Sequence, residues 1–120
     1  MLMTNITLPR AELVAKIIEA NSAIVAETAR SAVKDALQAI PAASSNVQNL
    51  MYDQAYYEVR DQMAVNLMDD ENLPTSQLQA YEIACKSEPG LKETIKHLGL
   101  AGIAATHQNA ARMRILSKFN

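Results

Sequence analysis

The side chains best suited to nucleophilic or metal chemistry in this 120-residue chain are one cysteine and two histidines: Cys85, His97 and His107. A zinc site needs closely spaced ligand pairs, and a Cys–His nucleophile needs an orienting residue and an oxyanion-binding loop. The spacings match no zinc pattern, and a predicted helix break separates the two histidines. We therefore expect no metal and no enzyme activity; a pocket holding Cys85 with a histidine in hydrogen-bonding reach is the alternative.

The other polar patterns carry no recognisable chemistry. Helical bundles often bind metals through a Glu-x-x-His sequence, which is missing here, and Gly90, Gly99 and Gly102 form no phosphate-binding loop. We therefore expect neither a cofactor nor a small-molecule substrate.

Acidic residues are concentrated between Met51 and Asn72, where six carboxylates oppose Arg60 alone and give a net charge of −5. They are Asp53, Glu58, Asp61, Asp69, Asp70 and Glu71. A solvated helix face is the simpler interpretation, and a carboxylate row facing a basic protein surface is the alternative.

Basic residues are concentrated at the other end, where residues 91–120 carry a net charge of +4. The candidates for phosphate contacts are Lys92, Lys96, Arg112, Arg114 and Lys118. Residues 91–116, with a turn at Gly99, resemble a degenerate helix-turn-helix. Ile95 stands where the crossing helices usually need a small residue, residues 101–105 offer no base-reading side chain, and the pI is 5.6. Nucleic-acid association is therefore the alternative function, behind protein binding.

The element that dominates the architecture is the run between Pro9 and Pro41, which contains no Gly or Pro. Its residue types favour one helix over 9–40, which would be about 45 Å long. A compact domain of this size is roughly 35 Å across, so the helix must kink, project from the domain or meet another copy of the chain.

The faces of this helix suggest two packing partners. Its apolar surface spans about 200°, which is wider than one packed stripe needs, and Asn21, Thr28 and Asp35 run through the middle. A buried polar residue in such a seam can fix the register of an oligomer. We therefore predict self-association through Ile17, Asn21, Ile24 and Thr28. The alternative is a kink at Asn21–Ser22.

A second long helix is predicted over residues 46–68, opened by a Ser45–Gln48 capping box. One face carries Tyr52, Tyr56, Val59, Met63 and Leu67. A weaker apolar stripe comprises Leu50, Tyr57, Ala64 and Met68, so this helix is expected to touch neighbours on two sides. Tyrosine and methionine are common at interfaces and equally common in half-buried cores. We predict a partner surface of Tyr52, Tyr56 and Met63, with the acidic loop Asp69, Asp70 and Glu71 at its rim.

The remaining elements complete an all-α fold of about five helices. A short helix starts near Ser76, and a C-terminal helical hairpin consists of a helix from Leu91 that ends at Gly99 and a helix from Leu100. No segment alternates as a strand would. We predict a flexible arm over 1–8 and a single helical domain over 9–120.

The compartment follows from what the chain lacks. It has one cysteine, no apolar run of eighteen residues and no secretion signal at its start, so we expect a cytoplasmic protein that does not bind membranes. The function we predict is a non-enzymatic, structural or regulatory accessory protein that binds itself and a second protein. Small helical proteins without motifs are frequent among phage and mobile-element accessory proteins.

Overall fold

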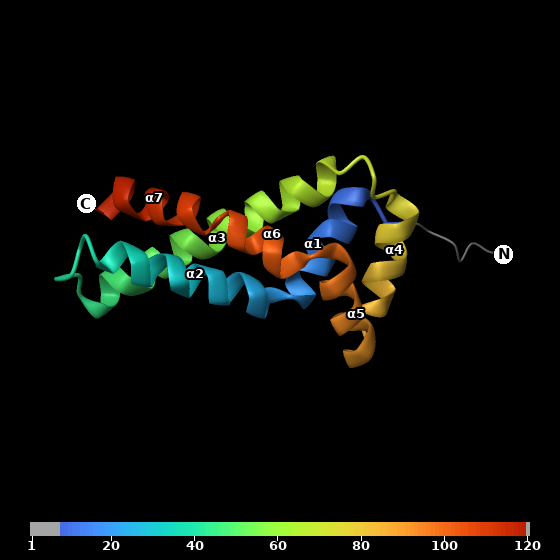
Figure 1. The fold of residues 1–120 in the computed structure, drawn as a ribbon, viewed down its shortest axis with the longest axis horizontal. Helices are drawn as coiled ribbons and strands as arrows, with labels where there is room; N and C mark the ends of the chain where they lie inside the picture. The colour runs from blue at the N-terminus through green and yellow to red at the C-terminus, as the bar shows by residue number, and fades with distance from the viewer. Residues whose placement is uncertain (1–7, 120) are drawn as a thin grey trace.

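The computed structural model describes residues 8–119, and over that range the chain is all-α, as predicted (Figure 1). The predicted flexible arm lies outside the described residues, apart from Leu8. The helices are α1 (Arg10–Ala20), α2 (Ser22–Leu37), α3 (Ser45–Asp69), α4 (Thr75–Ala84), α5 (Glu88–Leu98), α6 (Leu100–Thr106) and α7 (Gln108–Phe119).

The segment predicted as one helix over 9–40 is divided at Asn21 into α1 and α2. Asn21 adopts φ −111° and ψ 28°, and its backbone N–H donates to the carbonyl of Ile18 at 3.0 Å. Its side-chain Nδ2 donates to the carbonyl of Ile17 at 2.8 Å, which replaces the helical hydrogen bond lost at the break. The long segment between Pro9 and Pro41 is therefore accommodated by a kink, which was one of the three possibilities considered.

The two apolar flanks of this segment are covered by helices of the same chain. α2 contacts both α3 and α7, and α3 also contacts α7, so the three form a bundle (Figure 1). Three fully buried alanines, Ala29, Ala32 and Ala36, allow the helix axes to approach closely. The excess width of the apolar surface therefore reflects two neighbours within one fold.

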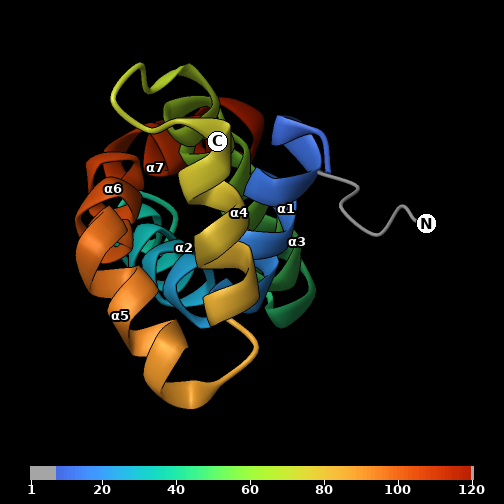
Figure 2. The same cartoon turned by 90° about the vertical axis from the view of Figure 1, so that its right-hand side faces the viewer.

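The other end of the molecule is built around α1, which packs against α3 and α4, while α5 packs against α4 and α6. Figure 2 looks from this end, with α4 and α5 in front of the bundle. Ser87 caps α5 by accepting a hydrogen bond from Gly90 N at 3.2 Å. A Cβ on Gly90 would lie 2.1 Å from the carbonyl oxygen of Ala84, so the α4–α5 turn requires glycine.

Most helix ends lie within a few residues of the positions that capping residues and glycines predict. The cap of α3 is Ser44, whose Oγ accepts from Val47 N at 3.3 Å, instead of the predicted Ser45. Gln48 still reaches back, to the carbonyl of Ala43 at 2.9 Å. Gly99 ends α5 with φ +62°, as predicted. The helix that follows is divided at His107 into α6 and α7.

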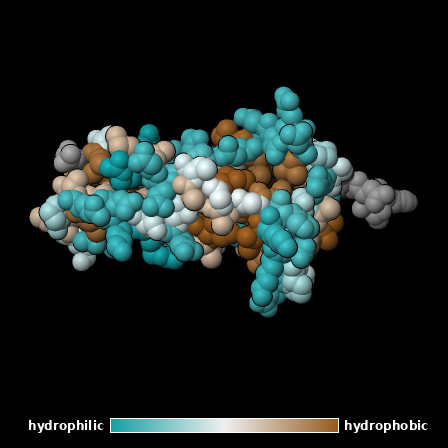
Figure 3. All heavy atoms as spheres, viewed as in Figure 1, coloured by the Kyte–Doolittle hydropathy of each residue, from teal (hydrophilic) through white to brown (hydrophobic). Residues whose placement is uncertain are grey.

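The molecule is elongated, with extents of 61 × 25 × 25 Å and a radius of gyration of 16.4 Å, against about 14 Å for a compact domain of this length. From here on, the arm means residues 29–55 and 108–119, which are distinct from the flexible arm predicted over 1–8. The head means residues 8–28 and 56–107. The arm holds most of α2, the first part of α3 and α7. On the face in Figure 3, hydrophilic residues dominate and apolar residues surface near the middle.

Candidate interaction surface

The residues predicted for self-association lie within the fold of a single chain. Ile17, Asn21 and Thr28 are 0%, 3% and 8% exposed, and Ile24 is half-buried against the core. They cannot contact a second chain unless α1 and α2 separate from α3 and α7. Self-association through these four residues stays a prediction, and it requires the bundle to open.

The thiol of Cys85 has no histidine among its hydrogen-bond neighbours in the described chain. Its sulfur lies 4.0 Å from Nδ2 of Asn21, and the residue is half-buried. His97 pairs with Glu93 at 3.3 Å and contacts the ring of Tyr81. The Cys–His arrangement that would indicate a nucleophile is therefore not formed by these groups.

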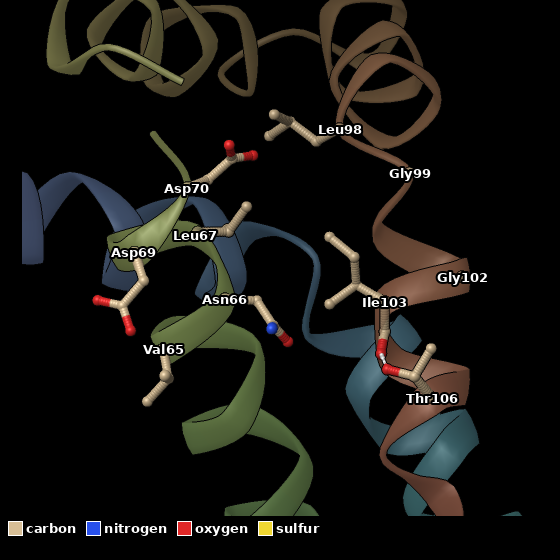
Figure 4. Close-up of a pocket in the computed structure, with 10 residues that line it drawn as sticks. All are labelled: Val65, Asn66, Leu67, Asp69, Asp70, Leu98, Gly99, Gly102, Ile103 and Thr106. Carbon is tan, nitrogen blue, oxygen red and sulfur yellow. Dashed lines mark hydrogen bonds between the residues drawn. The ribbon is translucent and has the colours of Figure 1, made fainter. Parts of the chain in front are cut away.

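A cavity of about 590 Å³ lies between the C-terminal part of α3 and the α5–α6 junction (Figure 4). Two of its polar side chains make contacts within the fold. Asn66 Oδ1 contacts the ring of His107, and the hydroxyl of Thr106 donates to the carbonyl of Ile103 at 2.6 Å. Figure 4 shows that the end of α3 lines one side of it, with Val65, Asn66 and Asp69, and that α6 lines the other. The cavity is a crevice between helices in which Asn66 and Thr106 make contacts within the fold.

Arg10 positions the acidic loop, a role that the sequence analysis missed. Its guanidinium donates to the carbonyl oxygens of Leu67 at 2.7 Å, Met68 at 2.9 Å and Leu73 at 2.6 Å. It also reaches the carbonyl of Asp70 and the hydroxyl of Thr75. The last carbonyls of a helix need donors, and a cation there opposes the negative end of the helix dipole.

Arg10 also accounts for a difference in helix length. Asp69 was predicted to lie in a loop because an anion is unfavourable at a helix C-terminus, yet α3 continues through it. The guanidinium at this end offsets that cost. Asp69, Asp70 and Glu71 are all exposed, and Asp70 Oδ1 accepts from Asn72 N at 2.9 Å.

The five predicted phosphate-contacting residues do not form one surface. Lys92 and Lys96 lie on α5 in the head, whereas Arg112, Arg114 and Lys118 lie on α7 in the arm (Figure 1). Arg112 is engaged with Asn109 at 3.0 Å. The helix-turn-helix resemblance also weakens, because the helix after the Gly99 turn ends at Thr106, before any basic residue.

Comparison with protein-family models, curated proteins and solved structures finds no match to this chain. Across residues 8–119, no helix combines the length and apolar character needed to cross a bilayer. In the same range, no three His, Cys, Asp or Glu residues gather where they could hold a metal ion.

The predicted partner surface on α3 is divided by burial. Met63 is fully buried, and Tyr52 and Tyr56 are half-buried against the core, with ring centroids 6.0 Å apart. The opposite face of α3 is the exposed one. It carries Leu50, Tyr57, Val65 and Met68, and the half-buried Ala64 lies at its edge; we call these five residues the α3 ridge.

The α3 ridge is the main apolar feature on the outer face of this helix. Leu50, Tyr57 and Val65 are 54%, 50% and 50% exposed, and Met68 is 36% exposed. Helical spacing predicts four of the five ridge residues and a neighbour beside them. In the described chain, Leu50, Tyr57, Val65 and Met68 remain exposed, and Ala64 is half-buried beside α1.

Two grooves lie beside the α3 ridge, one after the other along the side of α3 that carries Tyr52 and Tyr56. One, of about 410 Å³, lies between α1 and α3 and is lined by Ala15, Ile18, Tyr56 and Ala64 among others. The second, of about 400 Å³, lies between α2 and α3 beside Val33, Leu37 and Tyr52. Grooves beside an apolar ridge can accept the side chains of a packed helix.

Proposed function

We propose that this protein is a non-enzymatic accessory protein that works by binding another protein through the α3 ridge. The observation that carries the proposal is the row of four large apolar side chains, each 36% to 54% exposed, along one face of one helix. Single exposed apolar residues are ordinary, whereas a row rimmed by polar residues is typical of an interaction surface.

The polar surroundings of the ridge support this assignment. Arg60 lies 4.8 Å from the centre of the Tyr57 ring and pairs with Asp61 at 3.1 Å. Tyrosine and arginine together are enriched among the residues that contribute most to protein binding. The exposed carboxylates of Asp69 and Asp70 stand at the end of the ridge, where the sequence analysis placed the rim of a partner surface.

The neighbouring grooves suggest the form of the partner. Tyr52 and Tyr56, which the sequence predicts to lie on a partner surface, each line one of the two grooves. An amphipathic helix binds such a surface by setting apolar residues into grooves at helical spacing. We therefore propose a helical partner segment.

A photo-reactive amino acid in place of Tyr57 tests this function in the cells that naturally make the protein. We expect a discrete cross-linked protein adduct after illumination. The matched control is the same amino acid at Met113, which is 52% exposed on α7 and lies away from the ridge. Absence of an adduct at Tyr57, or equal adducts at both positions, would contradict the proposal.

Nucleic-acid association remains a second candidate, because the arm has five cations and two carboxylates and therefore a net charge of +3. Arg30 and Lys34 of α2 add to the three basic residues of α7. Phosphate-driven binding weakens steeply with salt. An electrophoretic shift of duplex DNA at low salt that is lost in Arg114→Ala with Lys118→Ala, but retained in Lys92→Ala with Lys96→Ala, would support it. No shift at low salt removes it.

A further inference from the structure

The registry of the α3 ridge indicates what kind of helix fits it. Leu50, Tyr57 and Ala64 recur every seven residues, and so do Gln54, Asp61 and Met68. Together they form the alternating three- and four-residue spacing of a seam between two paired helices. Most of the apolar members lie at the two ends of this seam, and its middle is polar.

An antiparallel pairing of two copies of α3 satisfies this pattern. In an antiparallel pair, the registry that sets Leu50 against Met68 of the second copy also sets Tyr57 against Asp61 of the second copy. The phenol can donate a hydrogen bond to the carboxylate, and two-fold symmetry makes each contact occur twice. A polar layer of this kind fixes registry in paired helices.

The charge distribution favours the same arrangement. The arm has a net charge of +3, and the head, with six cations and eleven carboxylates, has a net charge of −5. A parallel pair would place arm against arm and head against head, which sets like charges together. An antiparallel pair places each arm against the head of the other copy, so opposite charges meet at both ends.

Charged residues on both sides of the ridge have the opposite signs that an antiparallel pair requires. On the α7 side of the arm, Arg114 and Lys118 are exposed and would face the exposed Asp69 and Asp70 of the second copy. On the α2 side, the exposed Lys34 would face the exposed Glu12 of the second copy.

The available area fits a stable dimer. The 25 residues of α3 extend over about 37 Å. A strip of that length and roughly 20 Å wide, which includes the flanking helices, would bury on the order of 700 Å² per copy. Standard protein interfaces bury about 800 Å² per partner.

We infer that the partner of the α3 ridge is a second copy of this chain, bound antiparallel along α3 with Leu50 opposite Met68. This inference rests on the proposed protein-binding function and specifies its partner. The sequence analysis also expected self-association, through α1 and α2, but the surface assigned here is exposed in the folded chain.

Molar mass in solution, measured by light scattering on the full chain, gives the first test. At tens of micromolar we expect twice the mass of the 13.1 kDa chain. Leu50→Glu with Tyr57→Glu should weaken the association about tenfold or more, because it buries carboxylates without partners. The control Met113→Glu with Ile83→Glu changes residues that are similarly exposed outside the ridge and should leave the mass unchanged.

Disulfide trapping tests the registry with surface substitutions that leave the core intact. In a Cys85→Ser background, a Leu50→Cys chain mixed with a Met68→Cys chain should form the mixed disulfide in preference to either homodimer. Leu50→Cys homodimers as the main product would indicate parallel pairing and overturn the inference.

The combined outcomes separate the two proposals. A native chain that is monomeric at tens of micromolar overturns the self-pairing. If the photo-reactive residue at Tyr57 then captures a different protein, the proposed function stands; if it captures nothing, both proposals fail. A dimer that survives the ridge substitutions unchanged shows that the interface lies elsewhere and rejects this inference.

Discussion

At the residue scale, a few polar side chains hold together parts of the fold that are distant in sequence. Arg10 is the clearest case, since its guanidinium makes five hydrogen bonds to residues 57 to 65 positions away. Asn21 is another, because it is 3% exposed and its Nδ2 completes the hydrogen bonding of the break between α1 and α2. Both act through backbone carbonyls, which helix periodicity does not reveal.

Replacing Arg10 should destabilise the protein even though its side chain is only part-buried. Arg10→Ala removes every donor from the end of α3, and we expect a loss of about 2 kcal/mol in the free energy of unfolding, measured by urea titration. Arg10→Lys should recover less than half, because an ammonium cannot reproduce the fork of donors. Lys92→Ala, at an exposed position on α5, is the control; an equal effect there would contradict this role.

Two glycines make a matched pair with opposite expected effects. Gly90→Ala places a Cβ 2.1 Å from the carbonyl of Ala84 and should cost about 2 kcal/mol or more, because the α4–α5 turn must shift. Gly102→Ala meets nothing within 4 Å in α6 and should stabilise by about 0.5 to 1 kcal/mol. Thermal unfolding followed by circular dichroism reports both. A stabilised Gly90→Ala protein would mean that the turn is placed differently.

At the element scale, α2 and α3 are the two long helices of the bundle, and both are packed against several neighbours. The α2 helix packs against α3 and α7, and alanines keep both contacts close. Each helix also has an exposed face. That face of α2 carries Glu27, Arg30 and Lys34, whereas that of α3 carries Leu50, Tyr57 and Val65. This difference in the residues exposed explains why the interaction surface belongs to α3, although α2 has the broader apolar surface in sequence.

Enlarging a buried alanine of α2 should therefore be costly. Ala29→Leu adds volume between packed helices and should lower the unfolding free energy by about 1 to 3 kcal/mol. Ala23→Leu, at an exposed position of the same helix, keeps helix propensity similar and should change stability by less than about 0.5 kcal/mol. Equal urea midpoints for the two variants would show that α2 is not closely packed against its neighbours at Ala29.

At the scale of the whole molecule, shape and charge act along the same axis. The 61 Å length separates an arm of net charge +3 from a head of net charge −5. This polarity is not visible in the overall charge of −2. It gives two elongated copies a preferred relative direction before any apolar contact forms.

The antiparallel dimer should consequently be sensitive to ionic strength. Raising sodium chloride from low concentration to about 0.5 M shortens the screening length to a few ångström, so we expect severalfold weaker self-association by sedimentation analysis. Lys34→Glu should weaken it at low salt, and Glu12→Lys in the same chain should restore it. Association that strengthens with salt would point to purely apolar pairing without the charge contacts.

Much of the local structure could be predicted because it depends on near neighbours. The Gly99 stop follows from the freedom of glycine at positive φ, and the second stripe of α3 follows from helical spacing. The predicted cap of α3, Ser45, was one residue away from the observed cap, Ser44. Both serines offer the same hydroxyl, and only the path of the preceding chain selects between them. The role of Arg10 could not be predicted from the sequence, because its acceptors are backbone carbonyls of a turn that is distant along the chain.

The sequence by itself determined that the chain is helical, where most helices begin and end, and that two apolar faces needed partners. Only the tertiary structure decided which partners they are. The wide surface of residues 9–40 is satisfied within the chain because the break at Asn21 folds α1 and α2 back onto α3, α4 and α7. The narrower stripe of α3 remains exposed because the helices that pack against α3, which are α1, α2, α6 and α7, leave its outer face uncovered.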